Sequence, residues 1–185
     1  MCGNGGRCVI DFARVLDIIH NEVTFMAVDG VHKGRVLDQG IALKMQDVHV
    51  IQKMDKGLFL DTGSPHYVLM VDELNTLDVV KEGRLIRNSA NFIKKGVNVN
   101  FVLDGPELEL RTYERGVEDE TLSCGTGAVA TAIAMHYNKH TQENIVFLNS
   151  KGGVLNVSFD EFSGVYKNIW LSGEANMVYA GDFEC

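Results

Sequence analysis

The chain has 185 residues, of which 45% are hydrophobic and 23% charged, so it is long enough to bury the core of one large or two small domains. Its formal net charge of −8 argues against nucleic acid as a partner, because Lys94-Lys95 is the nearest approach to a basic cluster. Neither a membrane-spanning apolar run nor the basic-then-apolar order of a signal peptide is present, so we expect a cytoplasmic protein that binds no membrane.

The first predicted element is a helix that follows the bend Cys2-Gly3-Asn4-Gly5-Gly6 and ends near His20. Its apolar residues recur at spacings of three and four: Val9, Phe12, Ala13, Leu16 and Ile19. Strands over 22–28 and 31–37 flank Asp29-Gly30, which is a strong signal for a two-residue hairpin turn. A further strand is predicted over 41–45.

A second run of elements begins near Gly57, after a break at residues 49–56. The predicted helices of this run cover 74–87 and 125–137. The predicted strands cover 58–61, 66–71, 97–103, 107–113, 144–148, 154–159, 166–172 and 177–180. Hairpins mixed with helices favour the α+β class over strictly alternating βα units.

Two of the helices start at similar bends, Cys2-Gly3 and Cys124-Gly125, which predicts two structurally similar halves. A helix N-terminus carries partial positive charge and unpaired N–H groups, so we expect it to lower the pKa of a cysteine placed there. The same N–H groups, those of Gly3, Asn4, Gly125 and Thr126, are able to bind a carboxylate.

Two thiols opposed across the α-carbon of one small acid have the geometry that inverts a stereocentre. One removes a proton from one face while the other returns a proton to the opposite face. The alternative is that each cysteine is a small buried hydrophobe beside a turn, which a single Cys-Gly pair would favour. The repetition of the bend at two helix starts favours chemistry.

Structural disulfides and zinc are weaker interpretations of the four cysteines. A chain with this much apolar content needs no disulfides, and nothing indicates secretion. A zinc site would require paired Cys-x2-Cys or clustered Cys and His, which the spacing does not provide, so we expect no metal. A redox thiol module, in which the two cysteines form a disulfide, is a further alternative.

The motifs closely resemble those of the diaminopimelate epimerases. The resemblance is carried by Cys2 to Cys8, by Tyr113 to Gly116, by Glu118 to Ala128, by Asp61 to His66, by Asn98 to Phe101 and by Gly173 to Gly181. It extends over essentially the whole chain. The related proline racemases and hydroxyproline epimerases usually carry His where Asn4 stands.

This resemblance implies two similar domains, each a curved, mostly antiparallel sheet around a central helix. The first domain, residues 1–50 plus 176–185, would be incomplete, and the second would span 51–175. The implied activity is a cofactor-independent interconversion of LL- and meso-diaminopimelate in lysine and peptidoglycan precursor synthesis.

The resemblance also implies roles for individual residues. Cys124 would take the proton from the LL-isomer and Cys2 would deliver it to the other face, with His66 and Glu114 as further catalytic groups. The implied substrate-binding residues are Gly3, Asn4, Ser64, Asn98, Glu114, Arg115, Gly125 and Thr126. Tyr179 would lie at a homodimer contact.

Two departures from the family pattern leave alternatives open. Ser64 stands where the family commonly has Asn, which suggests a related racemase or epimerase with another substrate. Met1 leads directly into Cys2, from which we expect an N-terminal truncation, with a weakly active or inactive fragment as the other alternative.

Overall fold

The computed structural model describes residues 2–182. The predicted α+β class is confirmed. The helices are α1 (Gly3–Val15), α2 (Val79–Arg87) and α3 (Gly125–Tyr137). The strands are β1 (Glu22–Ala27), β2 (Gly30–Val36), β3 (Ile41–Lys44), β4 (Ile51–Met54), β5 (Gly57–Asp61), β6 (Pro65–Met70), β7 (Asn98–Leu103), β8 (Leu108–Glu114), β9 (Asp119–Thr121), β10 (Ile145–Ser150), β11 (Gly153–Phe162) and β12 (Val165–Gly173).

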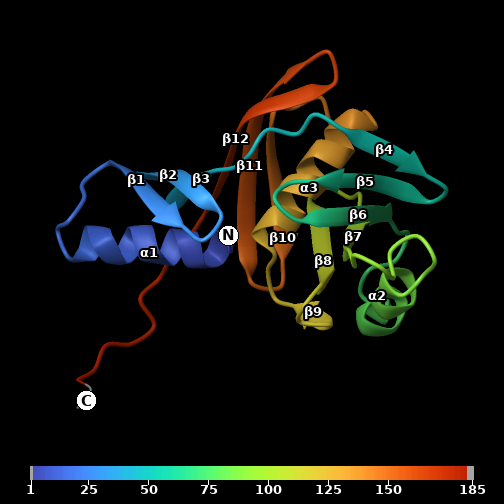
Figure 1. The fold of residues 1–185 in the computed structure, drawn as a ribbon, viewed down its shortest axis with the longest axis horizontal. Coiled ribbons are helices and arrows are strands. Elements are labelled where there is room, and N and C mark those ends of the chain that lie inside the picture. The colour runs from blue at the N-terminus through green and yellow to red at the C-terminus, as the bar shows by residue number, and fades with distance from the viewer. Residues whose placement is uncertain (1, 183–185) are drawn as a thin grey trace.

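The strands form one continuous, mostly antiparallel sheet in the order β1-β2-β3-β12-β11-β10-β8-β7-β6-β5-β4, with β9 on β8. Figure 1 shows the larger part of this sheet curving around α3, while α2 lies outside it and α1 lies beside β1 to β3. The exceptions to antiparallel pairing are β10 with β8 and β6 with β7. The sheet thus surrounds α3 in the larger half, while α1 covers one side of β1 to β3 in the smaller half (Figure 1).

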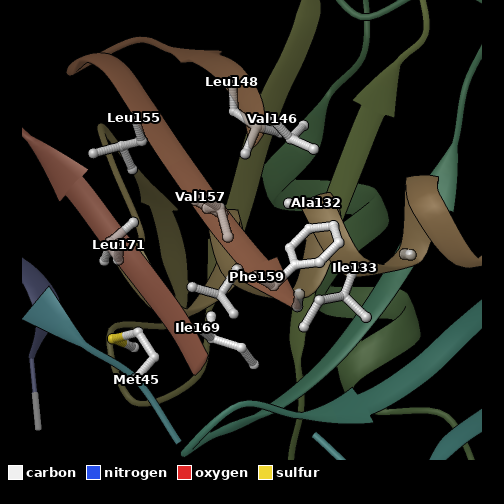
Figure 2. Close-up of a cluster of buried hydrophobic side chains, with 14 of the residues drawn as sticks. Met45, Ala132, Ile133, Val146, Leu148, Leu155, Val157, Phe159, Ile169 and Leu171 are labelled. Atoms are coloured by element: carbon white, nitrogen blue, oxygen red, sulfur yellow. The ribbon is translucent and has the colours of Figure 1, made fainter. Parts of the chain in front are cut away.

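Helix α3 forms the centre of the larger half, because its small residues allow the strands to approach it from several sides. All residues from Gly127 to Met135 are buried. Figure 2 shows Ala132 and Ile133 lying near Val157 and Phe159 of β11, within the same apolar cluster. A helix that is apolar around its whole circumference is typical of the interior of a protein.

Helix α1 packs on β2 and β3 with one face. Ile10 is 1% exposed, and a Cβ added at Gly34 of β2 would lie 2.2 Å from its Cδ1 atom. Glycine at position 34 therefore allows the helix to approach the strand closely. The rest of α1 carries exposed apolar side chains, including Val9, Phe12 and Val15.

The two halves join where β3 pairs with β12, with Leu171 opposite Leu43. Both side chains are fully buried and belong to the cluster that also holds Ile10 and Ile133. The core therefore runs through the junction between the two halves.

Several predicted element boundaries are wrong. Helix α1 ends at Val15 and not near His20, since Asp17 takes a left-handed φ of 58°. Helix α2 starts at Val79 and not at residue 74, because the carboxylate of Asp78 accepts a hydrogen bond from the backbone N–H of Lys81 and caps the helix. Strands β4 and β9 were not predicted.

The predicted strand over 177–180 is also wrong. Residues 174–182 have no regular secondary structure, and Figure 1 shows them running away from the sheet. The division into residues 1–50 plus 176–185 and 51–175 stays a prediction, and Met1 and residues 183–185 lie outside the described residues. No helix within 2–182 is long and apolar enough to cross a bilayer.

Candidate active site

The two cysteines of the repeated bend cap the two helices that meet at the junction. Cys2 and Cys124 are the N-cap residues of α1 and α3, and both have extended backbones. A Cβ added at Gly3 would lie 3.4 Å from the Cα atom of Gly125, and one added at Gly125 would lie 3.3 Å from that of Gly3. The predicted helix starts are confirmed, and the two starts are in backbone contact.

The contact between the helix starts rests on one buried side chain and one hydrogen bond. The Cδ2 atom of Leu171 would lie 3.0 Å from a Cβ at Gly3 and 2.7 Å from a Cβ at Gly125. The side-chain amide of Asn4 donates to the backbone carbonyl of Ser123 at 3.1 Å. The first turn of α1 is therefore tied to the residue that precedes Cys124.

The electrostatic surroundings of Cys124 differ from the sequence-based expectation of a lowered pKa. Burial, with a smaller contribution from the nearby carboxylate of Glu114, raises the pKa of the Cys124 thiol to about 11. The hydroxyl of Thr126 and the backbone N–H of Gly127 act in the opposite direction. Removal from water thus outweighs the helix N-terminus, and Cys124 is a thiol at neutral pH.

His66 lies at the start of a hydrogen-bonded chain that ends at Cys124. Its Nε2 atom is 2.9 Å from the hydroxyl of Thr126, and that hydroxyl is 3.6 Å from the Cys124 sulfur. Burial lowers the pKa of His66 to about 3, so the ring is neutral at physiological pH.

The neighbours of His66 fix its tautomer. Thr112 donates its hydroxyl to the side-chain oxygen of Asn100 at 2.9 Å, so the amide nitrogen of Asn100 faces Nδ1 of His66 at 2.9 Å and donates to it. The proton of His66 is therefore on Nε2 and points to Thr126. This arrangement frees the Thr126 hydroxyl to donate to the Cys124 sulfur.

Asn98 connects Ser64 with Arg115. Its amide nitrogen donates to the hydroxyl of Ser64 at 2.7 Å, and its side-chain oxygen accepts from the backbone N–H of Arg115 at 2.8 Å. The parallel pairing of β6 and β7 sets His66 beside Asn98. Three of the predicted substrate-binding residues therefore share one cluster beside the predicted catalytic histidine.

Glu114 and Arg115 lie at the end of β8. The carboxylate of Glu114 accepts a hydrogen bond from the hydroxyl of Thr121 on β9 at 2.9 Å, and its charge acts on the Cys124 thiol. The guanidinium of Arg115 is exposed and donates to the carbonyl of Lys95 at 3.1 Å.

Cys2 differs from Cys124 in being exposed. Cys2, Cys8 and Cys124 are free thiols, while Cys185 lies outside the described residues. Within residues 2–182, no three His, Cys, Asp or Glu side chains gather as metal ligands.

Several buried polar residues of the site had no predicted role. Thr62 donates its hydroxyl to the backbone carbonyl of Thr126 at 2.9 Å, and Asn100 and Thr112 orient His66. For Asn100 on β7 and Thr112 on β8 the available signal was a polar residue on the same face of its strand as an apolar one, because such a residue must be hydrogen-bonded when buried. Thr62 lies in the turn between β5 and β6, where no such pattern marks it. A separate, open cavity of about 700 Å³ lies between α2 and strands β4 and β6. Neither Cys2 nor Cys124 lines it.

Comparisons with known proteins bear on this arrangement. A family model described as diaminopimelate epimerase matches residues 58–178. The chain is 47% identical to the diaminopimelate epimerase of Flavobacterium psychrophilum over 182 residues, covering 97% of this chain and 71% of that protein. It is 39% identical to the diaminopimelate epimerase of Aquifex aeolicus, with 98% and 68% covered.

Solved structures with little sequence identity share the fold. A phenazine biosynthesis protein of the PhzF family from Bacillus anthracis is 10% identical, with a TM-score of 0.73 over 94% of this chain and 73% of that one. A hydroxyproline epimerase from Agrobacterium vitis is 18% identical, with a TM-score of 0.66 over 94% and 64%. These likenesses concern the fold alone, and they agree with the predicted fold class.

Proposed function

The chain belongs to the diaminopimelate epimerase family, and we propose from this premise that it interconverts LL- and meso-diaminopimelate by a two-cysteine mechanism. The observation that carries the proposal is the contact between the helix starts that Cys2 and Cys124 cap. Family membership supports the choice of substrate, and the contact between the two helix starts supports a site at which two thiols act on one α-carbon.

The reaction is a pair of proton transfers at the α-carbon of the substrate. In the direction from LL to meso, the Cys124 thiolate removes the α-proton and becomes a thiol, and the Cys2 thiol donates its proton to the opposite face. The reverse direction exchanges these roles. The raised pKa of Cys124 leaves it protonated at rest, which suits its role as the acid in the direction from meso to LL.

The α-carboxylate of the substrate would bind at the two helix starts. The first N–H groups of a helix have no intrahelical partner, and here Gly3, Asn4, Gly125 and Thr126 supply them from two helices. Their partial positive charge stabilises the negative charge that spreads into the carboxylate as the proton leaves. No cofactor enters this chemistry.

The remaining polar residues would serve the two catalytic groups and the rest of the substrate. His66 acts through Thr126, whose hydroxyl stabilises the Cys124 thiolate. Glu114 would attract the substrate ammonium next to Cys124, and Arg115 with Asn98 and Ser64 would bind its distal end.

We also propose that the protein works in the cytoplasm as a homodimer, in lysine and peptidoglycan precursor synthesis. Tyr179 is 87% exposed in an irregular segment where Met177 and Val178 are exposed as well. An exposed aromatic next to apolar side chains suits a contact between protomers. Sedimentation of the parent chain and of Tyr179→Ser tests this contact, and a parent that sediments as a monomer at high concentration contradicts it.

Exchange of the α-hydrogen in deuterated buffer tests the activity. We expect the parent chain to incorporate deuterium at the α-carbon of diaminopimelate, and we expect Cys2→Ser with Cys124→Ser to abolish it. Cys8→Ser is the matched control, because Cys8 is an exposed thiol on α1 outside the site. Retained exchange in the double variant, or turnover of proline in place of diaminopimelate, would contradict the proposal.

A further inference from the structure

Arg7 is a buried cation at the junction for which the proposed reaction has no use. Its side chain is 5% exposed although it lies on α1, four residues after Gly3. Helical side chains four residues apart share a face and lean toward the N-terminus, so its guanidinium lies back at the helix start. Burial lowers the pKa of Arg7, and electrostatic interaction with the nearby Cys8 and Cys2 opposes this effect.

Three glycines from three elements make room for this guanidinium. A Cβ added at Gly3 of α1 or at Gly125 of α3 would lie 3.9 Å from its Nη1 atom, and one at Gly173 of β12 would lie 3.5 Å from its Nε atom. Arg7 therefore sits where both cysteine-capped helices meet the strand that joins the two halves.

Two hydrogen bonds connect Arg7 with Ser123, the residue that precedes Cys124. Its Nη2 atom donates to the side-chain oxygen of Asn4 at 2.9 Å, and the amide of Asn4 donates to the carbonyl of Ser123 at 3.1 Å. Because the guanidinium holds the Asn4 oxygen, the Asn4 amide nitrogen is turned toward Ser123. The chain of contacts thus runs from α1 to the residue that precedes Cys124.

The burial of Arg7 is unfavourable for the free energy of folding, because its guanidinium is only partly hydrogen-bonded. The Nε and Nη1 atoms of Arg7 are buried and have no hydrogen-bond partner among residues 2–182. Removing a charge from water is unfavourable unless it is fully paired, and apolar residues of similar volume often replace buried charges without loss of stability. A contribution to stability therefore does not account for the burial of Arg7.

We propose that Arg7 is a positioning residue for the reaction, which holds Cys124 in line with Cys2 through Asn4 and Ser123. This inference rests on the proposed function. Inversion requires both sulfurs to face the same α-carbon, and a displacement of about 1 Å is able to cost a factor of about 100 in rate.

Misalignment has a chemical signature. After one thiolate has removed the α-proton, the carbanion takes a proton either from the opposite thiol, which inverts the centre, or from the same cysteine, which does not. The cysteine that removed the α-proton carries it as a thiol, and in deuterated buffer this thiol exchanges its proton for deuterium. Return from the same cysteine after that exchange places deuterium on uninverted substrate. The ratio of exchange without inversion to inversion therefore reports how well the second sulfur is aligned.

The experiment compares Arg7→Met and Arg7→Lys with the parent, and Arg14→Met is the matched control. Arg14 lies on the same helix, is 45% exposed and pairs with Asp11. We expect inversion to fall by about 10- to 100-fold in both Arg7 variants and the ratio to rise at least threefold, with the control unchanged. Loss of folded protein alone would lower both rates equally, so an unchanged ratio would overturn the inference.

A measurement without substrate keeps the test independent of activity. We expect the backbone amide resonances of residues 123–126 to shift in Arg7→Lys and to stay in place in Arg14→Met. Shifts confined to α1 would overturn the inference. If the parent chain also fails to exchange the α-hydrogen of diaminopimelate, the proposed function is contradicted. The amide resonances of residues 123–126 would still decide whether Arg7 acts on Cys124.

Discussion

At the scale of single residues, the site is governed by burial more than by helix dipoles. Cys124 caps a helix as Cys2 does, yet its pKa is raised to about 11 because it is removed from water. His66 is fully buried, and its pKa is lowered to about 3. Both groups are therefore uncharged at neutral pH, and the Cys124 thiolate needed in the direction from LL to meso depends on stabilisation by the Thr126 hydroxyl and the Gly127 N–H.

His66 makes stability depend on pH between about 3 and 6.5. The folded state holds the ring neutral while the unfolded state binds a proton below pH 6.5, so protonation favours unfolding as the pH falls through this window. Above pH 6.5 the effect is absent. Between pH 7 and pH 5 we expect a loss of about 2 kcal/mol in the free energy of unfolding.

Urea titrations at pH 7 and pH 5 measure this loss. His66→Gln is expected to be less stable than the parent at pH 7 and to lose less on acidification. His20→Gln, an exposed histidine on the loop after α1, is expected to lose as much as the parent. Equal pH dependence in the parent and His66→Gln would contradict the role given to His66.

At the scale of elements, the two helix starts touch because both begin with glycine. We expect Gly3→Ala to separate them, since its Cβ would lie 3.0 Å from Leu171 and 3.4 Å from the Cα atom of Gly125. Overpacking of this kind costs about 1–3 kcal/mol in stability. We expect kcat/KM to fall at least tenfold, because both cysteines move relative to the substrate.

Gly5→Ala is the control for this prediction, because Gly5 lies on the same helix as Gly3. A Cβ at position 5 would make only ordinary contacts with Cys2, at 3.7 Å or more. Alanine is the better helix former, so stability is expected to stay or rise by up to about 1 kcal/mol. Steady-state kinetics and thermal unfolding of both variants decide the matter, and equal activity in Gly3→Ala and Gly5→Ala would refute the steric argument.

The elements also reveal how far local sequence signals reach. The helix starts at Cys2 and Cys124 were predictable, because glycine bends and apolar periodicity are local features. The end of α1 was missed because the helical spacing of apolar residues continues past Asp17. The start of α2 was missed because similar spacing begins before Asp78. Strand β4 was missed because Ile51-Gln52-Lys53-Met54 does not alternate apolar and polar residues, and only pairing with β5 makes it a strand.

In the site too, local motifs were predictable from the sequence and effects of the tertiary structure were not. Motif resemblance predicted roles for His66, Asn98 and Glu114, but it could not predict that burial would raise the pKa of Cys124. That effect depends on strands from distant parts of the chain that close around α3. Arg7 had no predicted role, because an arginine at the start of a helix is ordinarily exposed and only the junction buries it.

At the scale of the whole molecule, the two halves share one sheet and one core, which has a consequence for unfolding. Strand β12 of the larger half pairs with β3 of the smaller one, and Leu171 packs beneath both helix starts. We therefore expect the chain to unfold in a single transition, with the smaller half unable to open separately.

Trp170, the single tryptophan, reports directly on this junction. Its ring lies on β12 opposite Lys44, with the guanidinium carbon of Arg35 from β2 stacked 4.1 Å from its centroid. Its fluorescence therefore reports on the packing of β2 and β3 of the smaller half against β12. Circular dichroism at 222 nm reports on the helices of both halves. The two probes are expected to give the same urea midpoint.

Leu171→Ala sharpens this prediction because it removes a fully buried side chain at the junction. A cavity of this kind costs about 2–5 kcal/mol, and with a shared core both probes must move to a lower midpoint together. Phe162→Ala on the same sheet is the control, since Phe162 is 78% exposed and its loss should leave both midpoints in place. A fluorescence transition that precedes the dichroism change in the parent would mean that the halves unfold separately, and the contact between Gly3 and Gly125 would then not be held by the common core.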